Sequence, residues 1–404
     1  MNDPAADARP SQHRLSPTVI WLGVVSLLTD ASSEMIYPLL PQFLRGVLGA
    51  STGFIGIVEG VAETTASMLK LASGRLSDAL PRRKPLTIAG YGLSSVARPL
   101  VALATAPWMV LAIRFCDRVG KGVRGSPRDA LVAQVTPPHR RGAAYGYHRA
   151  MDNSGAMIGP LVGFALLEYA HLDFRHLFAW AALPAALAMA ALVFGVKEPP
   201  RDPAPSLPKA TVGEVDGGDP RRLATYLVAV GVFTLGNSSD AFLIVRAGEA
   251  GVAPAWILLL WMLHNGVKAL LSRGFGVLSD RWGRRRLIGI GWAVYALTYL
   301  GFARATTAWQ VWALFGLYGL YYSLVEGSER ALVADLAGAR RRGTAFGWFH
   351  AITGLGALPA SVGFGAIYKV WGAGVAFSVG AAFAALACVL LAATTGGRLT
   401  PRRT

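Results

Sequence analysis

The sequence is poor in cysteine and in charged residues. Its two cysteines in 404 residues, Cys116 and Cys388, stand far apart without metal-ligand spacing, so neither a disulfide framework nor a cysteine metal site is expected. Charged residues make up 15% of the chain, against about 25% in soluble proteins. With 53% apolar residues and a mean hydropathy of +0.43, the composition excludes an ordinary soluble protein and indicates a membrane protein.

Signs of an enzyme are also lacking. No Gly-x-x-x-x-Gly-Lys-Ser/Thr run is present, which argues against an ATP site. The histidines do not cluster, and no nucleophile, base and orienting group stand at useful spacing. We therefore expect no catalysis and no bound metal or cofactor. A membrane sensor or scaffold is disfavoured as well, because the longest interval between apolar runs is too short for a soluble domain.

The apolar residues fall into runs of the roughly 20 residues that a helix needs to cross about 30 Å of hydrocarbon. The first 16 residues are polar, and the first run is too long and too interrupted for a cleaved signal peptide. The predicted fold class is an all-α membrane protein. Its twelve predicted transmembrane spans are 17–45, 51–73, 86–105, 107–135, 142–168, 173–196, 222–246, 254–275, 287–303, 308–337, 343–368 and 371–395.

Basic residues outnumber acidic ones, 39 to 23, and the net charge is +16. Such an excess can indicate a nucleic-acid partner, but the basic residues gather in alternate loops, as at 82–84, 140–141 and 284–286. By the positive-inside rule these loops are cytoplasmic. We therefore expect both termini in the cytoplasm and no nucleic acid among the partners.

The chain reads as two related halves. A polar interval rich in proline, glycine and charge, residues 197–221, is predicted to be a cytoplasmic linker between six-span units at 1–196 and 222–404. Gly74-Arg-Leu-Ser-Asp78 returns about 200 residues later as Gly276-Val-Leu-Ser-Asp280. Arg140-Arg-Gly-Ala-Ala-Tyr-Gly146 likewise returns as Arg341-Arg-Gly-Thr-Ala-Phe-Gly347. A duplicated six-helix unit explains both matches.

The repeated loop resembles the signature of the major facilitator superfamily, which has a glycine, an aspartate and paired basic residues between helices 2 and 3. In the first copy Pro81 stands where the signature has its second glycine, which implies an altered turn. The resemblance implies two pseudo-symmetric six-helix bundles. It also implies a gate in which the glycines allow close helix approach and the basic residues pair with carboxylates across the interface. The residues that fit it are Gly74, Asp78, Arg82, Arg83, Gly276, Asp280, Arg284 and Arg285.

Charged residues also fall inside the predicted spans, where each costs roughly 2.5–3.5 kcal/mol unless it faces a cavity or a partner. Span 4 carries a stripe of them at steps of three and four residues, and acidic residues of spans 1 and 2 are its predicted partners. The candidate substrate-binding and proton-binding residues are Asp30, Glu34, Glu59, Glu63, Arg114, Arg118, Lys121, Asp152, Asn237, Asp240, His264, Lys268 and Glu326. Because superfamily members often couple to protons through the half richer in carboxylates, the resemblance favours the first half.

Span 5 carries Gly155, Gly159 and Pro160 in a Gly-x-x-x-Gly-Pro-x-x-Gly run. Small residues four apart let another helix pack closely, and a proline removes a backbone donor. The run resembles the antiporter motif of superfamily exporters, and Arg114 resembles their buried arginine in span 4. Arg118 stands where those exporters have a glycine, so the more cationic span 4 favours an anionic or zwitterionic substrate.

These features predict a multi-pass transporter of a bacterial-type inner membrane that works as a monomer. We expect it to export a small organic compound in exchange for protons by alternating access, with that compound, protons and membrane lipid as its partners. The alternative is an importer or exchanger of organic anions. The span 4 stripe favours that alternative, as do Arg45 and Arg246 at matching places after spans 1 and 7.

Overall fold

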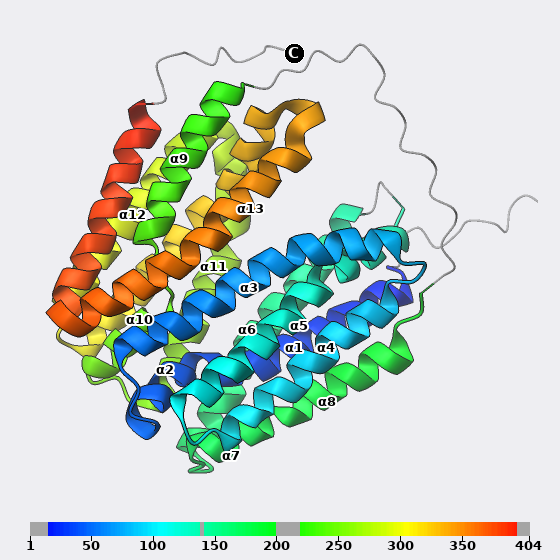
Figure 1. Cartoon of the computed structure of the whole chain (residues 1–404), viewed down its shortest axis with the longest axis horizontal. Helices are drawn as coiled ribbons and strands as arrows, with labels where there is room; N and C mark the ends of the chain where they lie inside the picture. The colour runs from blue at the N-terminus through cyan, green and yellow to red at the C-terminus, as the bar shows by residue number, and fades with distance from the viewer. Residues whose placement is uncertain (1–14, 138–140, 199–218, 394–404) are drawn as a thin grey trace, which may run out of the picture.

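The computed structural model describes residues 15–137, 141–198 and 219–393, and these residues form helices and no strands (Figure 1). Most of the predicted linker 197–221 lies outside the described residues. The chain follows the order that the apolar runs predict, one helix after another. The prediction of an all-α membrane protein therefore agrees with the described part of the chain.

The first half consists of helices joined by short turns. They are α1 (Pro17–Ile36), α2 (Leu40–Gln42), α3 (Thr52–Ala79), α4 (Lys84–Ala97), α5 (Pro107–Gln134), α6 (Arg141–Glu168), α7 (Phe174–Trp180) and α8 (Ala182–Ala190). Two 3₁₀ segments, Tyr37–Leu39 and Arg98–Leu103, and two π segments, Phe43–Val47 and Ala191–Gly195, extend them. α1 packs against α6 and α8, while α5 packs against α3 and α4.

Proline positions several helix ends. α1, α5, α9 and α11 each have a proline in their first turn, where the missing N–H is not needed. Pro38 and Pro41 act differently: α1 ends at Ile36, and the chain continues through a 3₁₀ turn before α2. The two prolines therefore follow directly after the end of α1, close to Glu34.

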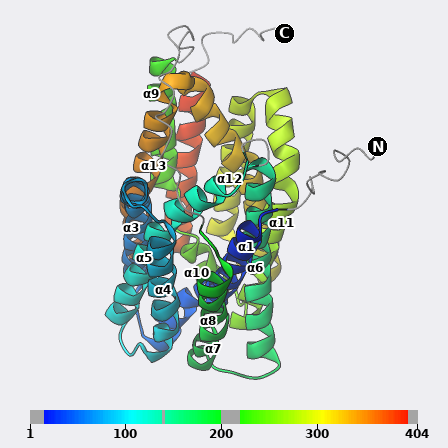
Figure 2. The same cartoon turned by 90° about the vertical axis from the view of Figure 1, so that its right-hand side faces the viewer.

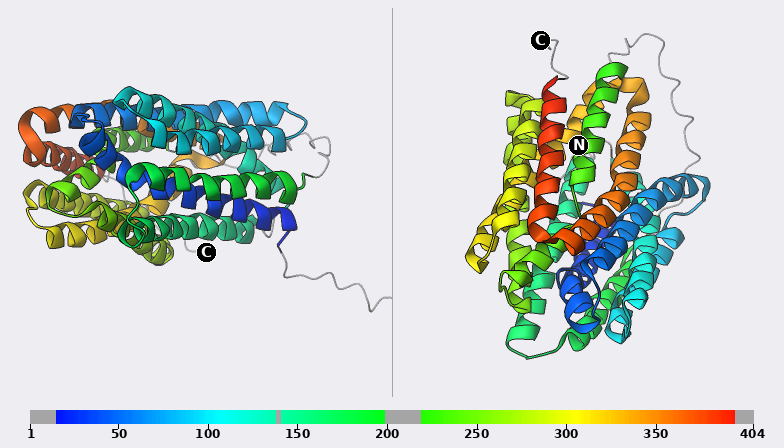
Figure 3. Two further views of the ribbon diagram at one scale, coloured as in Figure 1. Left: turned by 90° about the horizontal axis from the view of Figure 1, so that it is seen from below. Right: turned by 60° about the vertical axis from the view of Figure 1, so that its left-hand side comes forward.

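The second half begins with α9 (Pro220–Gly236) and α10 (Ala241–Glu249), followed by α11 (Pro254–Trp282), α12 (Arg284–Arg304) and α13 (Ala308–Ala393). α13 has 86 residues and would be about 130 Å long if it were straight. Figure 3 shows instead that the chain reverses within it, between its orange and red parts, and Gly372 of this range has φ +81°. α13 packs against α9, α11 and α12.

Among the described residues, seven helical segments are long and apolar enough to cross a membrane. They are Pro17–Val47, Lys84–Leu103, Phe174–Gly195, Pro220–Glu249, Pro254–Ser272, Arg284–Arg304 and Ala345–Ala393. α3, α5 and α6 are not among them, although each has 28 residues. Their polar residues, rather than their lengths, set these three apart, and they carry most of the candidate site residues of the first half.

The two halves of the chain are joined along α3 with α13 and along α6 with α11. Figure 1 shows the first pair side by side, and Figure 2 shows the second. At one end of the molecule α10 also contacts α2 and the 3₁₀ segment Tyr37–Leu39. From this end the two sets of helices diverge toward the other end (Figure 1).

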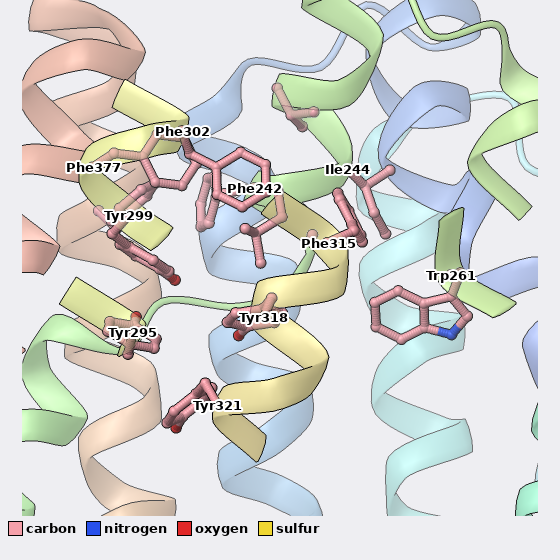
Figure 4. Packing of buried hydrophobic residues seen from close by; sticks show 14 of the residues in the cluster. Phe242, Ile244, Trp261, Tyr295, Tyr299, Phe302, Phe315, Tyr318, Tyr321 and Phe377 are labelled. Carbon is pink, nitrogen blue, oxygen red and sulfur yellow. The ribbon is translucent and has the colours of Figure 1, made fainter. Parts of the chain in front are cut away.

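Aromatic rings form much of the core of the second half. The rings of Tyr295 and Tyr299 stack with their centroids 4.1 Å apart, and Tyr318 and Tyr321 lie beside them (Figure 4). Phe233 stacks on the buried Trp292 at 4.8 Å. Because such rings have few rotatable bonds, they form a stiff wall between α9, α12 and α13.

Candidate functional site

A polar cavity of about 560 Å³ lies between the two halves of the chain. Residues from α3, α5 and the Tyr37–Leu39 segment form one wall, and residues from α9, α11 and α13 form the other. A second cavity, of about 570 Å³, has apolar walls of α9 and α13, and none of its lining residues in the described part of the chain is charged. The polar cavity is therefore the candidate site. Six of the predicted binding residues line it: Glu63, Lys121, Asn237, Asp240, Lys268 and Glu326.

The second-half wall of the cavity is built around a break in a helix. α9 ends at Gly236 and α10 begins at Ala241, so Asn237 and Asp240 stand in irregular backbone between them. The hydroxyl of Tyr318 donates a hydrogen bond of 2.6 Å to Asp240 Oδ1. Asn237 Oδ1 is buried, and it has no hydrogen-bond partner among the described residues. The break thus places two residues that carry oxygen acceptors in the lining of the same cavity.

Lys268 and Glu326 form an ion pair on this wall, with Nζ and Oε2 3.2 Å apart. Arg149 of α6 reaches the same carboxylate from the first half, at 2.8 Å from Oε1. Tyr322 supports the pair, since the ammonium of Lys268 lies 4.8 Å from its ring centroid. Glu326 is therefore held by cations of both halves.

The first-half wall carries Glu63 and Lys121. Glu63 lies 3.4 Å from Arg118, while Lys121 is exposed to the cavity. Both side chains come from the pair of charged helices, α3 and α5, whose predicted partnership is thereby found. In the span 4 stripe, Arg114 and Arg118 face α3 and Lys121 faces the cavity, as expected for charges that cannot face lipid.

Behind this wall lies a buried network of ions. Arg114 donates to both carboxylate oxygens of Glu59, at 3.1 and 3.2 Å, and Glu59 is 2% exposed. Asp117 accepts a bond of 2.9 Å from Arg98 and lies 3.8 Å from Arg114. Each buried charge therefore has a counter-charge, as the low dielectric of the interior requires. Glu59 and Arg114 do not line the cavity but support the residues that do.

Asp30, Glu34 and Asp152 lie outside the cavity lining. Glu34 accepts a hydrogen bond of 2.6 Å from the indole of Trp261 in the other half, so it sits at the contact between α1 and α11. Asp152 accepts a short hydrogen bond from Ser26 and lies 3.5 Å from His148. Asp30 stands on the face of α1 that packs against α6.

His264 is 3% exposed and lies among aromatic rings. Its ring centroid is 5.2 to 5.3 Å from those of Trp261, Tyr318 and Tyr322. It does not line the cavity, in contrast to Lys268 one turn later on α11. Its position is that of a packed core residue, and the structure does not bring it into the group of cavity residues.

The glycines of the span 5 run make the contact between α6 and α1. A Cβ on Gly155 would clash with the carbonyl oxygen of Leu27, and one on Gly159 would clash with that of Ala31. The close packing predicted for this run is therefore present. α6 also runs through Pro160 without ending.

The loop motifs make their contacts within each half. Arg83 donates to Gln134 at 3.0 Å, and Arg284 lies 2.6 Å from Asp335, so the two copies place equivalent bonds at the ends of equivalent helices. Asp335 belongs to the same half as Arg284, so this bond does not cross the interface, and the pairing of Arg284 across the interface stays a prediction. Arg82 is exposed. The side chains of Asp78 and Asp280, and the surroundings of Gly74, lie outside the described residues.

Two further expectations for this loop meet different outcomes. Among the described atoms, nothing lies within 4 Å of a Cβ built on Gly276, so close helix approach is not found there. The altered first turn is found. In the second copy the single residue Gly283, at φ +94°, joins α11 to α12. A proline cannot adopt this positive φ, so the first copy, with Pro81, uses the four residues 80–83 to join α3 to α4.

Opposite charges hold the closed end of the molecule together. Glu249 of α10 lies 2.8 Å from Arg45 of the first half and 3.4 Å from Arg246, and the hydroxyl of Tyr368 donates to it at 2.5 Å. The two arginines at matching places thus share one carboxylate. We name this group, Arg45, Arg246, Glu249 and Tyr368, the end cluster.

Replacing Glu249 with glutamine is expected to shift the conformational equilibrium toward opening of this end. A partly exposed ion pair contributes about 0.2–1 kcal/mol, so the population ratio should change by up to about fivefold. Spin labels at the exposed Val47 and Val370, after Cys116 and Cys388 are replaced with alanine, would report the separation of the halves. An unchanged distance distribution would contradict the role of the cluster. The exposed Glu168→Gln is the matched control.

Several site residues were missed in the sequence. Tyr37, Tyr321, Tyr322 and Glu329 line the cavity, and the Tyr-Gly-Leu-Tyr-Tyr run of span 10 was the signal for Tyr321 and Tyr322.

The carboxylate of Glu198 accepts hydrogen bonds from the backbone N–H groups of Arg83 and Lys84, at 2.7 and 2.9 Å. It thereby caps the start of α4. No sequence signal pointed to Glu198.

An all-helical membrane protein with a polar cavity between its two halves has the architecture of a carrier. The family model of the Major Facilitator Superfamily matches residues 22–265 and 250–403. The chain therefore belongs to this superfamily, whose members are transporters rather than enzymes.

Relatives and solved structures agree with this assignment. An uncharacterized MFS-type transporter of Methanocaldococcus jannaschii is 34% identical over 369 residues, covering 89% of this chain and 90% of that protein. The multidrug resistance protein MdtH of Edwardsiella ictaluri is 27% identical over 365 residues, covering 87% and 86%. The crystal structure of the nucleoside transporter NupG has a TM-score of 0.76 at 11% identity, covering 94% of this chain and 100% of that one, so it shares the fold.

Proposed function

We propose that the protein exports a small organic compound in exchange for protons by alternating access. In this proposal its twelve spans form two six-helix bundles in a bacterial-type inner membrane, with both termini in the cytoplasm, and one chain is the working unit. The observation that carries the proposal is the polar cavity with walls from both halves. A compound bound there would be released to either side as the halves rock about it.

The end cluster supports alternating access. Arg45 and Glu249 come from opposite halves and close the cavity at one end, while the helices diverge at the other. The diverging end carries the basic loops, which are cytoplasmic by the positive-inside rule. The structure would then represent the inward-facing state, and the end cluster would lie on the external side.

Glu34 and Asp30 support proton coupling. The Glu34 carboxylate is bonded to Trp261 of the opposite half, so its surroundings change when the halves move apart. A carboxylate whose surroundings change between two states binds protons differently in each, which couples protonation to conformation. Inward proton flow would supply about 2.3 kcal/mol per charge per 100 mV of membrane potential.

Two observations favour export over anion import. Gly155 and Gly159 pack α6 onto α1 as the exporter-like motif requires, and the relative MdtH is named a multidrug resistance protein. The cations that suggested an anion carrier are largely paired: Arg114 with Glu59, Arg118 with Glu63, and Arg45 and Arg246 with Glu249. An organic-anion importer or exchanger is the second candidate, favoured by Lys121 at the cavity.

Transport by purified protein in pH-loaded liposomes tests the proposal. Compounds from a mixed panel of cationic drugs, organic anions and zwitterions are added, and proton movement is followed together with that of the compound. Asp30→Asn and Glu34→Gln are each expected to abolish compound-driven proton flux, because neither side chain can then exchange a proton. Asp173→Asn, at an exposed loop position, is the control.

If the compound moves at the same rate with and without a pH gradient, proton coupling is wrong and the protein is a facilitator. Movement confined to anions, with another anion required on the opposite side, would favour the exchanger. Full proton flux in both carboxylate variants would place the coupling group elsewhere in the chain.

A further inference from the structure

We propose that the cavity binds a zwitterionic compound, with its anionic group at Lys121 and its ammonium group at Asp240 and Asn237. This inference rests on the proposed transport function, since it names the substrate class of the same site. It starts from the charges that line the cavity, namely Glu63, Lys121, Asp240, Lys268, Glu326 and Glu329.

Three of these charges are already neutralised by side chains. Glu63 faces Arg118 at 3.4 Å, and Glu326 faces Lys268 at 3.2 Å. Among the residues that the structure describes, Lys121, Asp240 and Glu329 have no oppositely charged side chain within 4.0 Å. These three are the charges that a bound molecule can satisfy.

Asp240 is better placed than Glu329 to receive an ammonium group. Glu329 accepts a hydrogen bond of 3.1 Å from the buried indole of Trp292, which turns it toward α12. Asp240 stands in the break between α9 and α10 together with Asn237, whose Oδ1 is buried and unpartnered among the described residues. An ammonium has three N–H groups to donate, and two acceptors at one break suit it.

Lys121 supplies the opposite charge from the opposite wall. It belongs to α5 of the first half, whereas Asp240 belongs to the second half, and both line the same cavity. Its neighbour Arg118, one turn earlier, is occupied by Glu63. Lys121 is therefore the cation that a carboxylate of the bound molecule would meet.

Closure of the cavity explains why both charges of the ligand are needed. When the halves close around a bound molecule, water leaves, and an unpaired charge is far costlier to bury than a paired one. A simple cation would leave Lys121 unpaired, and a simple anion would leave Asp240 unpaired. A zwitterion pairs with both Lys121 and Asp240, and because they lie on opposite halves it also links the two walls. Glu329 keeps its hydrogen bond from the indole of Trp292.

The remaining lining residues determine the size and shape of the uncharged part of the ligand. The rings of Phe233, Tyr321 and Tyr322 and the small residues Ser67 and Gly354 line the same space. A cavity of about 560 Å³ is within the roughly 300–1,000 Å³ range of drug-sized sites. These walls suit an aromatic or other flat body between the two charged groups.

A matched set of compounds tests the proposal on the purified full-length protein. Ciprofloxacin is zwitterionic, its methyl ester is a cation and its N-acetyl derivative is an anion; phenylalanine, its methyl ester and N-acetylphenylalanine form a smaller set. Dissociation constants are measured by equilibrium dialysis. In at least one set the zwitterion should bind tighter than both singly charged forms, by about tenfold or more.

Two substitutions should separate the two ends of the ligand. Asp240→Asn is expected to weaken zwitterion binding by about 10- to 100-fold and to leave the N-acetyl form unchanged. Lys121→Gln should weaken the zwitterion similarly and leave the ester unchanged. The exposed Asp173→Asn and Lys197→Gln, which remove the same charges outside the cavity, should change nothing.

Equal binding of all three forms would overturn the proposal, as would failure of both zwitterions to bind. A larger loss of ester binding in Glu329→Gln than in Asp240→Asn would overturn the assignment of the ammonium site. The proposed function would fail by a different result. If the zwitterion binds as expected but never crosses the liposome membrane, the transport proposal is wrong and the binding-site proposal stands. Proton-linked transport that neither Asp240→Asn nor Lys121→Gln changes would support the proposed function and overturn the zwitterion site.

Discussion

Replacing Asp117 with asparagine is expected to lower the free energy of unfolding by about 3–5 kcal/mol, because it breaks a buried ion network from one side. Asp117 is 5% exposed and Arg98 is 6% exposed, so no water replaces the lost carboxylate. Arg98 also donates to the backbone oxygen of Thr29, and its unpaired charge would disturb α1 as well as α4 and α5. The measurement is thermal unfolding of the detergent-solubilised protein.

Asp129 provides the matched control on the same helix. Its side chain is 53% exposed and lies 2.9 Å from the adjacent Arg128. Exposed pairs of this kind contribute about 0–1 kcal/mol, so Asp129→Asn should leave the melting temperature close to that of the parent. Equal melting temperatures for the two variants would mean that the network of Asp117 is not a major source of stability.

Replacing Gly155 with alanine is expected to abolish transport. A Cβ at this position would clash with the carbonyl oxygen of Leu27, a backbone atom that cannot move aside without shifting α1. α1 carries Asp30 and Glu34, so a shift would displace both candidate proton-binding groups. Transport in liposomes, together with the melting temperature, would separate a displaced site from an unfolded protein.

Gly146 is the control for this change, since it lies on the same helix and a Cβ there meets nothing within 4 Å. Gly146→Ala also improves helix propensity, by up to about 1 kcal/mol. It should therefore keep transport and stability. Normal transport in Gly155→Ala would show that the contact between α6 and α1 tolerates separation and would argue against its part in the mechanism.

Local signals in the sequence predicted the helices well. The apolar runs predicted an all-helical chain, and Pro81 in place of a glycine predicted the altered first turn. The break at 237–240 was not predicted. No proline stands there, and the apolar run continues on both sides, so only packing against the rest of the fold selects the irregular backbone.

The sequence predicted many of the residues that form the site, but not how their side chains are arranged in it. Helical spacing put Arg114, Arg118 and Lys121 on one stripe, but spacing could not show that two of them face Glu59 and Glu63 while the third stays open to the cavity. His264 and Lys268 looked equivalent in sequence. They differ because ring packing surrounds one and the cavity borders the other, which is a property of the tertiary structure.

The end cluster and the Asp117 network respond differently to the surrounding solution. The side chains of Arg45 and Glu249 are 37% and 27% exposed, so dissolved ions reach them and screen their attraction over about 10 Å at 0.1 M salt. The side chains of Arg98 and Asp117, at 6% and 7%, are shielded from such ions. If the halves rock as proposed, ionic strength on the side of the end cluster would shift the equilibrium between the open and closed states, while the Asp117 network would be unaffected. A salt gradient would then act on the protein independently of any bound molecule.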